Sequence, residues 1–392
     1  MIASNQELYM SSPGDLYLNQ AHQGEARWWS WIMVFWFFIL GWLAVQMVLL
    51  SPIGAIANKI DPESAAALDE VAVAMAQDPE ALQAMLIWGG VFMLTTLSGL
   101  IAWPINRYTR GTGKTIFGWI TGIGVAGSFY SMFRLAPLMS DPEGNAVIGS
   151  LMGQSPLVYA LFVLVFPASL IGLYLAYKYI HKRSLTSLHT AASKINWKRG
   201  LQAFFLTWAV WALFALILKL TGLGDIRANF QPKTFAIYAL ISITLIPLQS
   251  ATEEIIFRGY LNQAFHRFLR NKWVVFTLTS LLFTAVHLAN PEALEGAENG
   301  KLWFTMSGYF VFGFAACLLV WMDGGLESAI GLHAANNTFA AIFLNYEGSV
   351  LPTPSLFMTT PNVNIDMPVT IISMVVIVLI LYKLRPPQGA AA

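Results

Sequence analysis

The feature that most constrains this chain is a series of long apolar stretches. Apolar residues make up 56% of the 392 residues, and charged residues only 11%. A soluble domain carries about a quarter of charged residues, so this composition indicates a membrane protein. An α-helix needs about 20 apolar residues to cross a bilayer, and many of the stretches reach that length. We therefore expect an all-α fold, a polytopic transmembrane helical bundle.

Searching the chain for such stretches predicts about ten membrane spans. The third holds several glycines and has Arg134 near its end. The sixth is too long for a simple span, and we expect Pro247 to kink it. The predicted spans are 28–50, 85–105, 115–138, 157–178, 201–219, 235–268, 273–289, 303–322, 326–345 and 369–384.

Basic residues predict how these spans are oriented, because Lys and Arg collect in cytoplasmic loops. Basic and acidic connections alternate along the chain, which predicts that both termini are cytoplasmic. The basic connections hold Arg107, Arg110 and Lys114, then Lys178, Lys182, Arg183, Lys194, Lys198 and Arg199, then Arg267, Arg270 and Lys272. Two of the expected outer loops hold Asp61, Glu63, Asp69 and Glu70, and Glu292, Glu295 and Glu298.

Three short polar fragments lie in the apolar stretches of the C-terminal half. Ionisable residues inside a bilayer are costly and usually functional. Residues i and i+4 share one face of a helix, so each fragment presents its end residues together. If the fragments converge, they form one polar site suited to hydrolysis. The fragments are Glu253-Glu254-x-x-x-Arg258, Phe283-x-x-x-His287 and His333-x-x-x-Asn337.

The two adjacent glutamates should have different tasks. Neighbouring residues of an α-helix point about 100° apart. Glu254 lies one helical turn before Arg258 and is its natural partner, which leaves Glu253 to face the site. We expect Phe283 to serve packing rather than chemistry.

The depths of the fragments in the membrane also agree. Glu253 lies about 17 residues before the polar turn at Arg270–Lys272 and His287 about 16 residues after it, so an antiparallel hairpin brings both to one level. His333 follows the turn at Asp323–Gly325 by about nine residues, on the same predicted side. A rise of 1.5 Å per residue then places the site roughly 13 Å below the cytoplasmic face.

The ordered set of three fragments resembles the CPBP intramembrane proteases, which include the type 2 CAAX prenyl endopeptidases and the bacteriocin-processing and self-immunity proteins. The resemblance covers about residues 235–345. It implies that Glu253 and His287 activate the attacking water and that Glu254 and Arg258 brace the site. It also implies that His333 and Asn337 stabilise the oxyanion. Both metal-dependent and glutamate-type mechanisms are considered for the family.

The chemistry of these residue types is consistent with hydrolysis. The reaction needs a base, a held water and hydrogen-bond donors aimed at the developing oxyanion. A divalent metal such as Zn²⁺ is an alternative, with Glu253, His287 and His333 as its ligands. Asparagine is a poor zinc ligand and the chain has no His-Glu-x-x-His motif, so we favour a water-activating glutamate.

The chain is expected to have four parts. Residues 1–26 form a polar cytoplasmic N-terminus, and residues 27–220 a transmembrane region outside the family resemblance. Residues 235–345 form the protease-like core, and residues 346–392 an outer loop, a last transmembrane helix and a short tail. The expected location is a bacterial inner (plasma) membrane, which the protein crosses many times.

Two functions of other classes stay open. One is a proton-coupled transporter in which Glu253, Arg258 and His287 relay protons, and the other is a non-catalytic membrane scaffold. Residues 1–200 contain no second copy of the three fragments, which argues against a duplicated carrier. The expected partners are membrane lipid and a membrane-associated peptide or protein, and the chain carries no nucleic-acid signature.

Overall fold

A computed structural model of the protein describes residues 12–139, 142–346 and 348–385. Its described residues form two compact units, one within Met1–Ser51 and Ser155–Ala392 and the other within Pro52–Gln154. Helices make up nearly all of the regular structure, and the three strands of the described part are two or three residues long. The predicted polytopic helical bundle is confirmed.

Eight helical stretches in the described residues are long and apolar enough to cross a membrane. They overlap eight of the ten predicted spans. The other two predictions, 273–289 and 326–345, fall on shorter helices of 14 and 12 residues. The eight stretches are Trp28–Ile60, Pro79–Tyr108, Gly111–Leu135, Pro156–His181, Trp197–Thr221, Pro232–Leu269, Leu302–Asp323 and Val363–Leu384.

The described residues of the unit within Pro52–Gln154 form five helices. Its acidic segment, expected as an outer loop, is helical instead, because the Ala-rich sequence after Pro62 has high helix propensity. Arg134 is accommodated near the end of its span by packing over the Trp88 ring, 4.4 Å from the ring centroid. The helices are α4 (Ile53–Ile60), α5 (Pro62–Gln77), α6 (Pro79–Tyr108), α7 (Gly111–Met139) and α8 (Pro142–Gln154).

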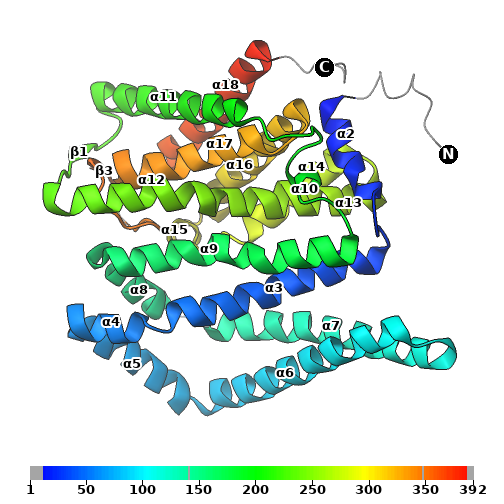
Figure 1. The fold of residues 1–392 in the computed structure, drawn as a ribbon. Coiled ribbons are helices and arrows are strands. Elements are labelled where there is room, and N and C mark those ends of the chain that lie inside the picture. The colour runs from blue at the N-terminus through cyan, green and yellow to red at the C-terminus, as the bar shows by residue number, and fades with distance from the viewer. Residues whose placement is uncertain (1–11, 140–141, 347, 386–392) are drawn as a thin grey trace. The chain divides into compact units, whose positions relative to one another are not determined.

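The other unit contains all three polar fragments (Figure 1). Its long helices are α3 (Trp28–Leu50), α9 (Pro156–Ala176), α11 (Trp197–Thr221), α12 (Pro232–Glu254), α16 (Leu302–Asp323) and α18 (Val363–Leu384). Its shorter helices are α2 (Pro13–Asn19), α10 (Thr186–His189), α13 (Asn262–Leu269), α14 (Lys272–Ala285), α15 (Pro291–Glu298) and α17 (Glu327–Thr338). A 3₁₀ turn, η1 (Gln20–His22), and three π-helical segments, η2 (Tyr177–His181), η3 (Ile255–Leu261) and η4 (Phe339–Phe343), complete the helical structure.

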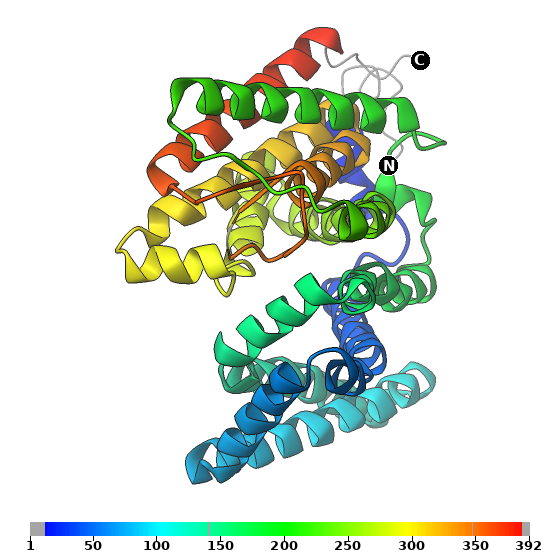
Figure 2. The ribbon, with the colours of Figure 1, turned by 90° about the vertical axis from the view of Figure 1, so that its left-hand side faces the viewer.

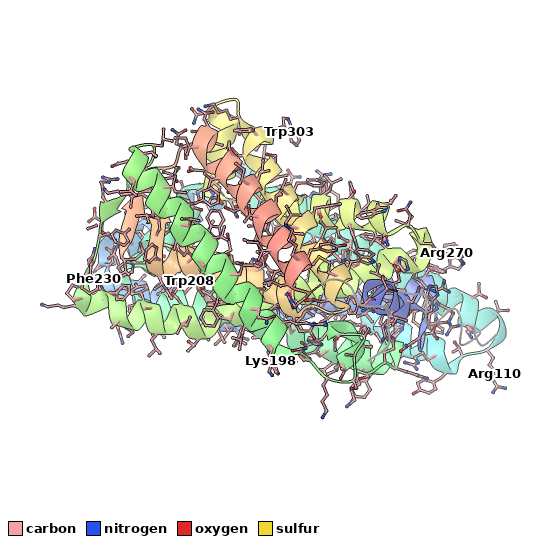
Figure 3. All side chains as sticks on the ribbon, turned by 90° about the horizontal axis from the view of Figure 1, so that it is seen from above. Arg110, Lys198, Trp208, Phe230, Arg270 and Trp303 are labelled. Carbon is pink, nitrogen blue, oxygen red and sulfur yellow. The ribbon has the colours of Figure 1, made fainter. Side chains whose placement is uncertain are left out.

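The short helix α17 lies between α11 and α12 (Figures 1 and 2). It approaches α11 closely, since a Cβ atom on Gly331 would lie 2.1 Å from the Gly200 carbonyl oxygen. Near its other end lies Trp208 of α11, which is labelled in Figure 3. Its indole donates to the Thr338 hydroxyl at 3.1 Å. Neighbouring helices thus cover α17, so it need not span the bilayer by itself.

The segments that connect the helices near η4 form a small sheet in the order β1-β3-β2. Strand β3 (Phe357–Thr359) pairs antiparallel with β1 (Arg227–Ala228) and parallel with β2 (Leu344–Tyr346). The sheet supplies hydrogen bonds to backbone that leaves the helical structure, which a membrane protein requires wherever water is scarce. It ties the chain after α17 to the chain after α11.

Candidate active site

The three fragments lie where helices change or end. Glu253 and Glu254 are the last residues of α12, and the chain continues without a break into the π-helical segment η3, which carries Arg258. His287 follows the end of α14, and α17 carries both His333 and Asn337. Single π-helical turns occur often at functional sites.

The Glu254 carboxylate connects two of the fragments. Its Oε1 atom accepts a hydrogen bond from Arg258 Nη1 at 2.9 Å and another from His333 Nδ1 at 2.7 Å. The side chains of Glu254 and Arg258 are fully buried. The predicted pairing of Glu254 with Arg258 is confirmed. The bond to His333 comes from a separate helix and was not predicted.

Arg258 extends this connection to α14. Its guanidinium carbon lies 4.2 Å from the centroid of the Phe283 ring, a distance suited to a cation–π interaction. Gly313 makes room for the guanidinium, because a Cβ atom there would lie 3.1 Å from Arg258 Nη2. Phe283 therefore serves packing, as expected, and it supports the arginine as well.

His287 is oriented by the backbone of α14, the helix that it follows. Its Nδ1 atom lies 2.6 Å from the Phe283 carbonyl oxygen, which can only accept a hydrogen bond. Nδ1 therefore carries the hydrogen, and in the neutral ring Nε2 presents a lone pair. Nε2 lies 4.0 Å from Glu253 Oε2.

Glu254 orients the His333 ring in the same way, by binding its Nδ1 atom. Since the carboxylate accepts from Nδ1, the Nε2 atom of neutral His333 also presents a lone pair. This Nε2 atom lies 3.9 Å from Glu253 Oε2. The family resemblance implied that His333 stabilises the oxyanion, which requires its ring to donate a hydrogen bond. Donation from Nε2 requires the doubly protonated imidazolium form.

Three acceptor atoms therefore converge at Glu253 Oε2, His287 Nε2 and His333 Nε2. The Glu253 oxygen is buried and has no hydrogen-bond partner among the described residues. Acceptors about 4 Å apart do not bond each other, whereas one water molecule can donate to two of them. The arrangement can hold a water and remove a proton from it.

The same three atoms fit a zinc ion less well. Zn–N and Zn–O bonds of about 2.0–2.1 Å at a tetrahedral centre place two ligand atoms about 3.4 Å apart. The separations from Glu253 Oε2 are 4.0 and 3.9 Å. Over the described ranges, no group of three or more His, Cys, Asp or Glu side chains is arranged to hold a metal ion.

Asn337 reaches the site through another residue. Its Nδ2 atom donates to Gln249 Oε1 at 3.2 Å and to Ser250 Oγ at 3.4 Å. The Gln249 amide nitrogen in turn donates to Glu253 Oε1. Sequence reasoning missed Gln249, although it precedes Glu253 by four residues and therefore shares its face of α12.

The structure thus brings all six predicted site residues together. Five of them are joined by direct contacts through Glu254 and Glu253. Asn337 is joined to them by way of Gln249.

Comparison with known proteins agrees with this site. Residues 232–339 match the family model described as type II CAAX prenyl endopeptidase Rce1-like. The chain is 30% identical over 251 residues to the uncharacterized protein YyaK of Bacillus subtilis (strain 168). The aligned residues cover 62% of this chain and 80% of YyaK. No solved structure matches the chain significantly.

The protein is an integral membrane protein with multiple spans, and it belongs to the type II CAAX prenyl endopeptidase (Rce1-like) family of proteases. The resemblance deduced from the three fragments is confirmed. The matched residues contain all of the fragments.

The buried ion pair can be tested by a double-mutant cycle. Glu254→Gln and Arg258→Met each leave a charge unpaired in a low-dielectric place, so each should lower the free energy of unfolding by about 3 kcal/mol. The double variant should lose less than the sum of the two, by more than about 1 kcal/mol. The measurement is thermal unfolding, in detergent, of the purified wild-type protein, the two single variants and the double variant.

The exposed pair of Arg27 and Glu25 provides the matched control, because its arginine side chain is 67% exposed. A cycle of Glu25→Gln and Arg27→Met should show a coupling below about 1 kcal/mol. Additive losses at Glu254 and Arg258 would contradict the proposed dependence of the site on their pairing.

Proposed function

We propose that this protein is an intramembrane endopeptidase that hydrolyses a peptide bond of a membrane-associated protein or peptide. The observation that carries the proposal is the convergence of three acceptor atoms on one point, with Glu253 Oε2 4.0 Å from His287 Nε2 and 3.9 Å from His333 Nε2. Membership of a protease family supports the same reaction class.

In the proposed reaction, the water donates hydrogen bonds to Glu253 Oε2 and to one histidine. Glu253 takes a proton from the water while the oxygen attacks the carbonyl carbon of the substrate. The carbonyl oxygen becomes the oxyanion of a tetrahedral intermediate. Collapse of this intermediate breaks the C–N bond, and the proton held by Glu253 passes to the leaving amine, which restores the carboxylate.

The surrounding residues assist each of these steps. Gln249 binds Glu253 Oε1, which leaves Oε2 for the water. The Glu254 carboxylate holds His333 by Nδ1, so Nε2 can donate to the oxyanion only while the ring carries a second proton. For Asn337 to donate to the oxyanion directly, its amide must release Gln249 or Ser250. Catalytic hydrogen bonds of this kind often form only when substrate is bound.

Removing the base should stop the reaction and spare the fold. Glu253→Gln keeps the size of the side chain and its bond to Gln249 but removes the negative charge. We expect kcat to fall by about 10²–10⁴-fold with little change in thermal stability. Cleavage of a peptide library by purified protein in detergent, followed by mass spectrometry, provides the measurement.

The matched control is Glu295→Gln, the same substitution at an exposed glutamate of α15, which should leave kcat unchanged. Near-normal cleavage by well-folded Glu253→Gln protein would eliminate the proposed base. If neither the wild-type protein nor the Glu295→Gln variant cleaves any peptide, the result would favour the transporter or scaffold functions.

We also propose that the water is activated without a metal. The separations of 3.9 and 4.0 Å between the acceptor atoms favour water over zinc. Protein washed with a chelator should keep its activity, and elemental analysis should find no stoichiometric zinc. Loss of activity that added Zn²⁺ restores would instead identify Glu253, His287 and His333 as metal ligands.

The active site is further proposed to open to the cytoplasm of a bacterial cell, with both termini on that side of the inner membrane. The basic hairpin of Arg267, Arg270 and Lys272 supports this orientation. In a Cys317→Ser background, Asn337→Cys should react with a membrane-impermeant thiol reagent in inverted vesicles only.

Glu295→Cys, at an exposed position of the expected outer side, is the control and should react in right-side-out vesicles only. Labelling of Asn337→Cys from the outer face would refute the orientation and the cytoplasmic substrate. Cysteine labelling measures only whether the thiol reagent reaches the introduced cysteine, so its outcome does not depend on the assays of peptide cleavage.

A further inference from the structure

A second polar cluster lies beside His287 and takes no part in the reaction described above. The imidazole packs against two aromatic rings, with centroid separations of 4.5 Å to Phe283 and 4.4 Å to Tyr309. Phe283 belongs to α14, which ends just before His287, whereas Tyr309 comes from α16. Tyr309 therefore connects the catalytic histidine to a different part of the bundle.

Tyr309 is itself held by the chain that follows His287. The Asn290 side-chain amide donates to the Tyr309 hydroxyl at 2.9 Å, and that hydroxyl donates to Glu292 Oε1. The Asn290 backbone N–H donates to the His287 carbonyl oxygen at 3.1 Å. The residues just after His287 thus fold back onto the tyrosine that contacts its ring.

We propose that Tyr309 is a positioning residue of the active site. Its ring keeps the His287 imidazole turned so that Nε2 faces Glu253, and Asn290 with Glu292 keep the Tyr309 ring in place. The inference rests on the proposed function of His287, whose ring orientation it concerns.

His287 needs such support because it lies beyond Ala285, the last residue of α14. Within the described part of the chain, one hydrogen bond fixes its ring, from Nδ1 to the Phe283 carbonyl oxygen. That bond leaves the ring free to tilt about the Nδ1 atom, and a tilt carries Nε2 away from Glu253. Misplacement of a reacting group by about 1 Å can cost about 100-fold in rate.

Tyr309 contributes a ring and a hydroxyl, and two variants separate them. Tyr309→Leu removes both, whereas Tyr309→Phe keeps the ring and removes the bonds to Asn290 and Glu292. The neighbouring residue Phe310 packs on Phe314 in the same helix, so Phe310→Leu is a matched control for loss of a ring from α16.

We expect kcat of Tyr309→Leu to fall by about 30–100-fold, with KM within about threefold of the wild-type value. Tyr309→Phe should recover most of the activity, to within about tenfold of wild type, and Phe310→Leu should match wild type. A Tyr309→Leu variant with wild-type kcat, or a Tyr309→Phe variant as impaired as Tyr309→Leu, would overturn the proposal.

A second measurement needs no peptidase activity. Diethyl pyrocarbonate modifies neutral histidine rings, and mass spectrometry of the digested protein gives the rate at His287. This rate should rise severalfold in Tyr309→Leu, rise less in Tyr309→Phe, which loses only the bonds that hold the ring, and stay at the wild-type value in Phe310→Leu. An unchanged rate in Tyr309→Leu would overturn the positioning role. If wild-type protein cleaves no peptide, the proposed function fails, and the labelling still decides whether Tyr309 holds His287.

Discussion

The site depends on one buried carboxylate oxygen, Glu254 Oε1, which accepts hydrogen bonds from Arg258 and His333. The bond from His333 joins α17 to the end of α12, the bond from Arg258 adds η3, and the packing of Arg258 on Phe283 adds α14. A carboxylate and a guanidinium that are buried together neutralise each other, whereas either one alone would carry a large desolvation penalty. Three helices therefore meet at a point where their mutual positions are energetically coupled.

The same pairing leaves Glu253 in a distinct electrostatic position. Glu254 is paired with Arg258, so Glu253 is the carboxyl group that is left to face the two histidines. Its two oxygens differ, since Gln249 binds one and the other is buried without a hydrogen-bond partner in the described part of the chain. An unsatisfied carboxylate oxygen between two lone pairs is a strong acceptor for water.

Each of the two histidines is held by a hydrogen bond at Nδ1, the ring nitrogen that does not face Glu253. His287 uses Nδ1 to bind a backbone carbonyl and His333 uses Nδ1 to bind a carboxylate, so each ring directs Nε2 toward Glu253. The two supports differ in charge. His333 is bound by a carboxylate, and His287 is bound by a neutral carbonyl group.

The amino-acid sequence by itself determined the membrane class, most of the spans, and the contacts that lie within one helix. Glu254 and Arg258 are four residues apart, and the helical period places them together whatever surrounds them. Gln249 could have been found from the same period. Only the tertiary structure decided that His333 binds Glu254, that Asn337 binds Gln249 and that Tyr309 packs on His287. Such contacts depend on the distance between neighbouring helices and on the rotation of each helix about its axis. Close packing, such as that of Gly331 against Gly200, sets both. The local periodicity of the sequence does not encode them.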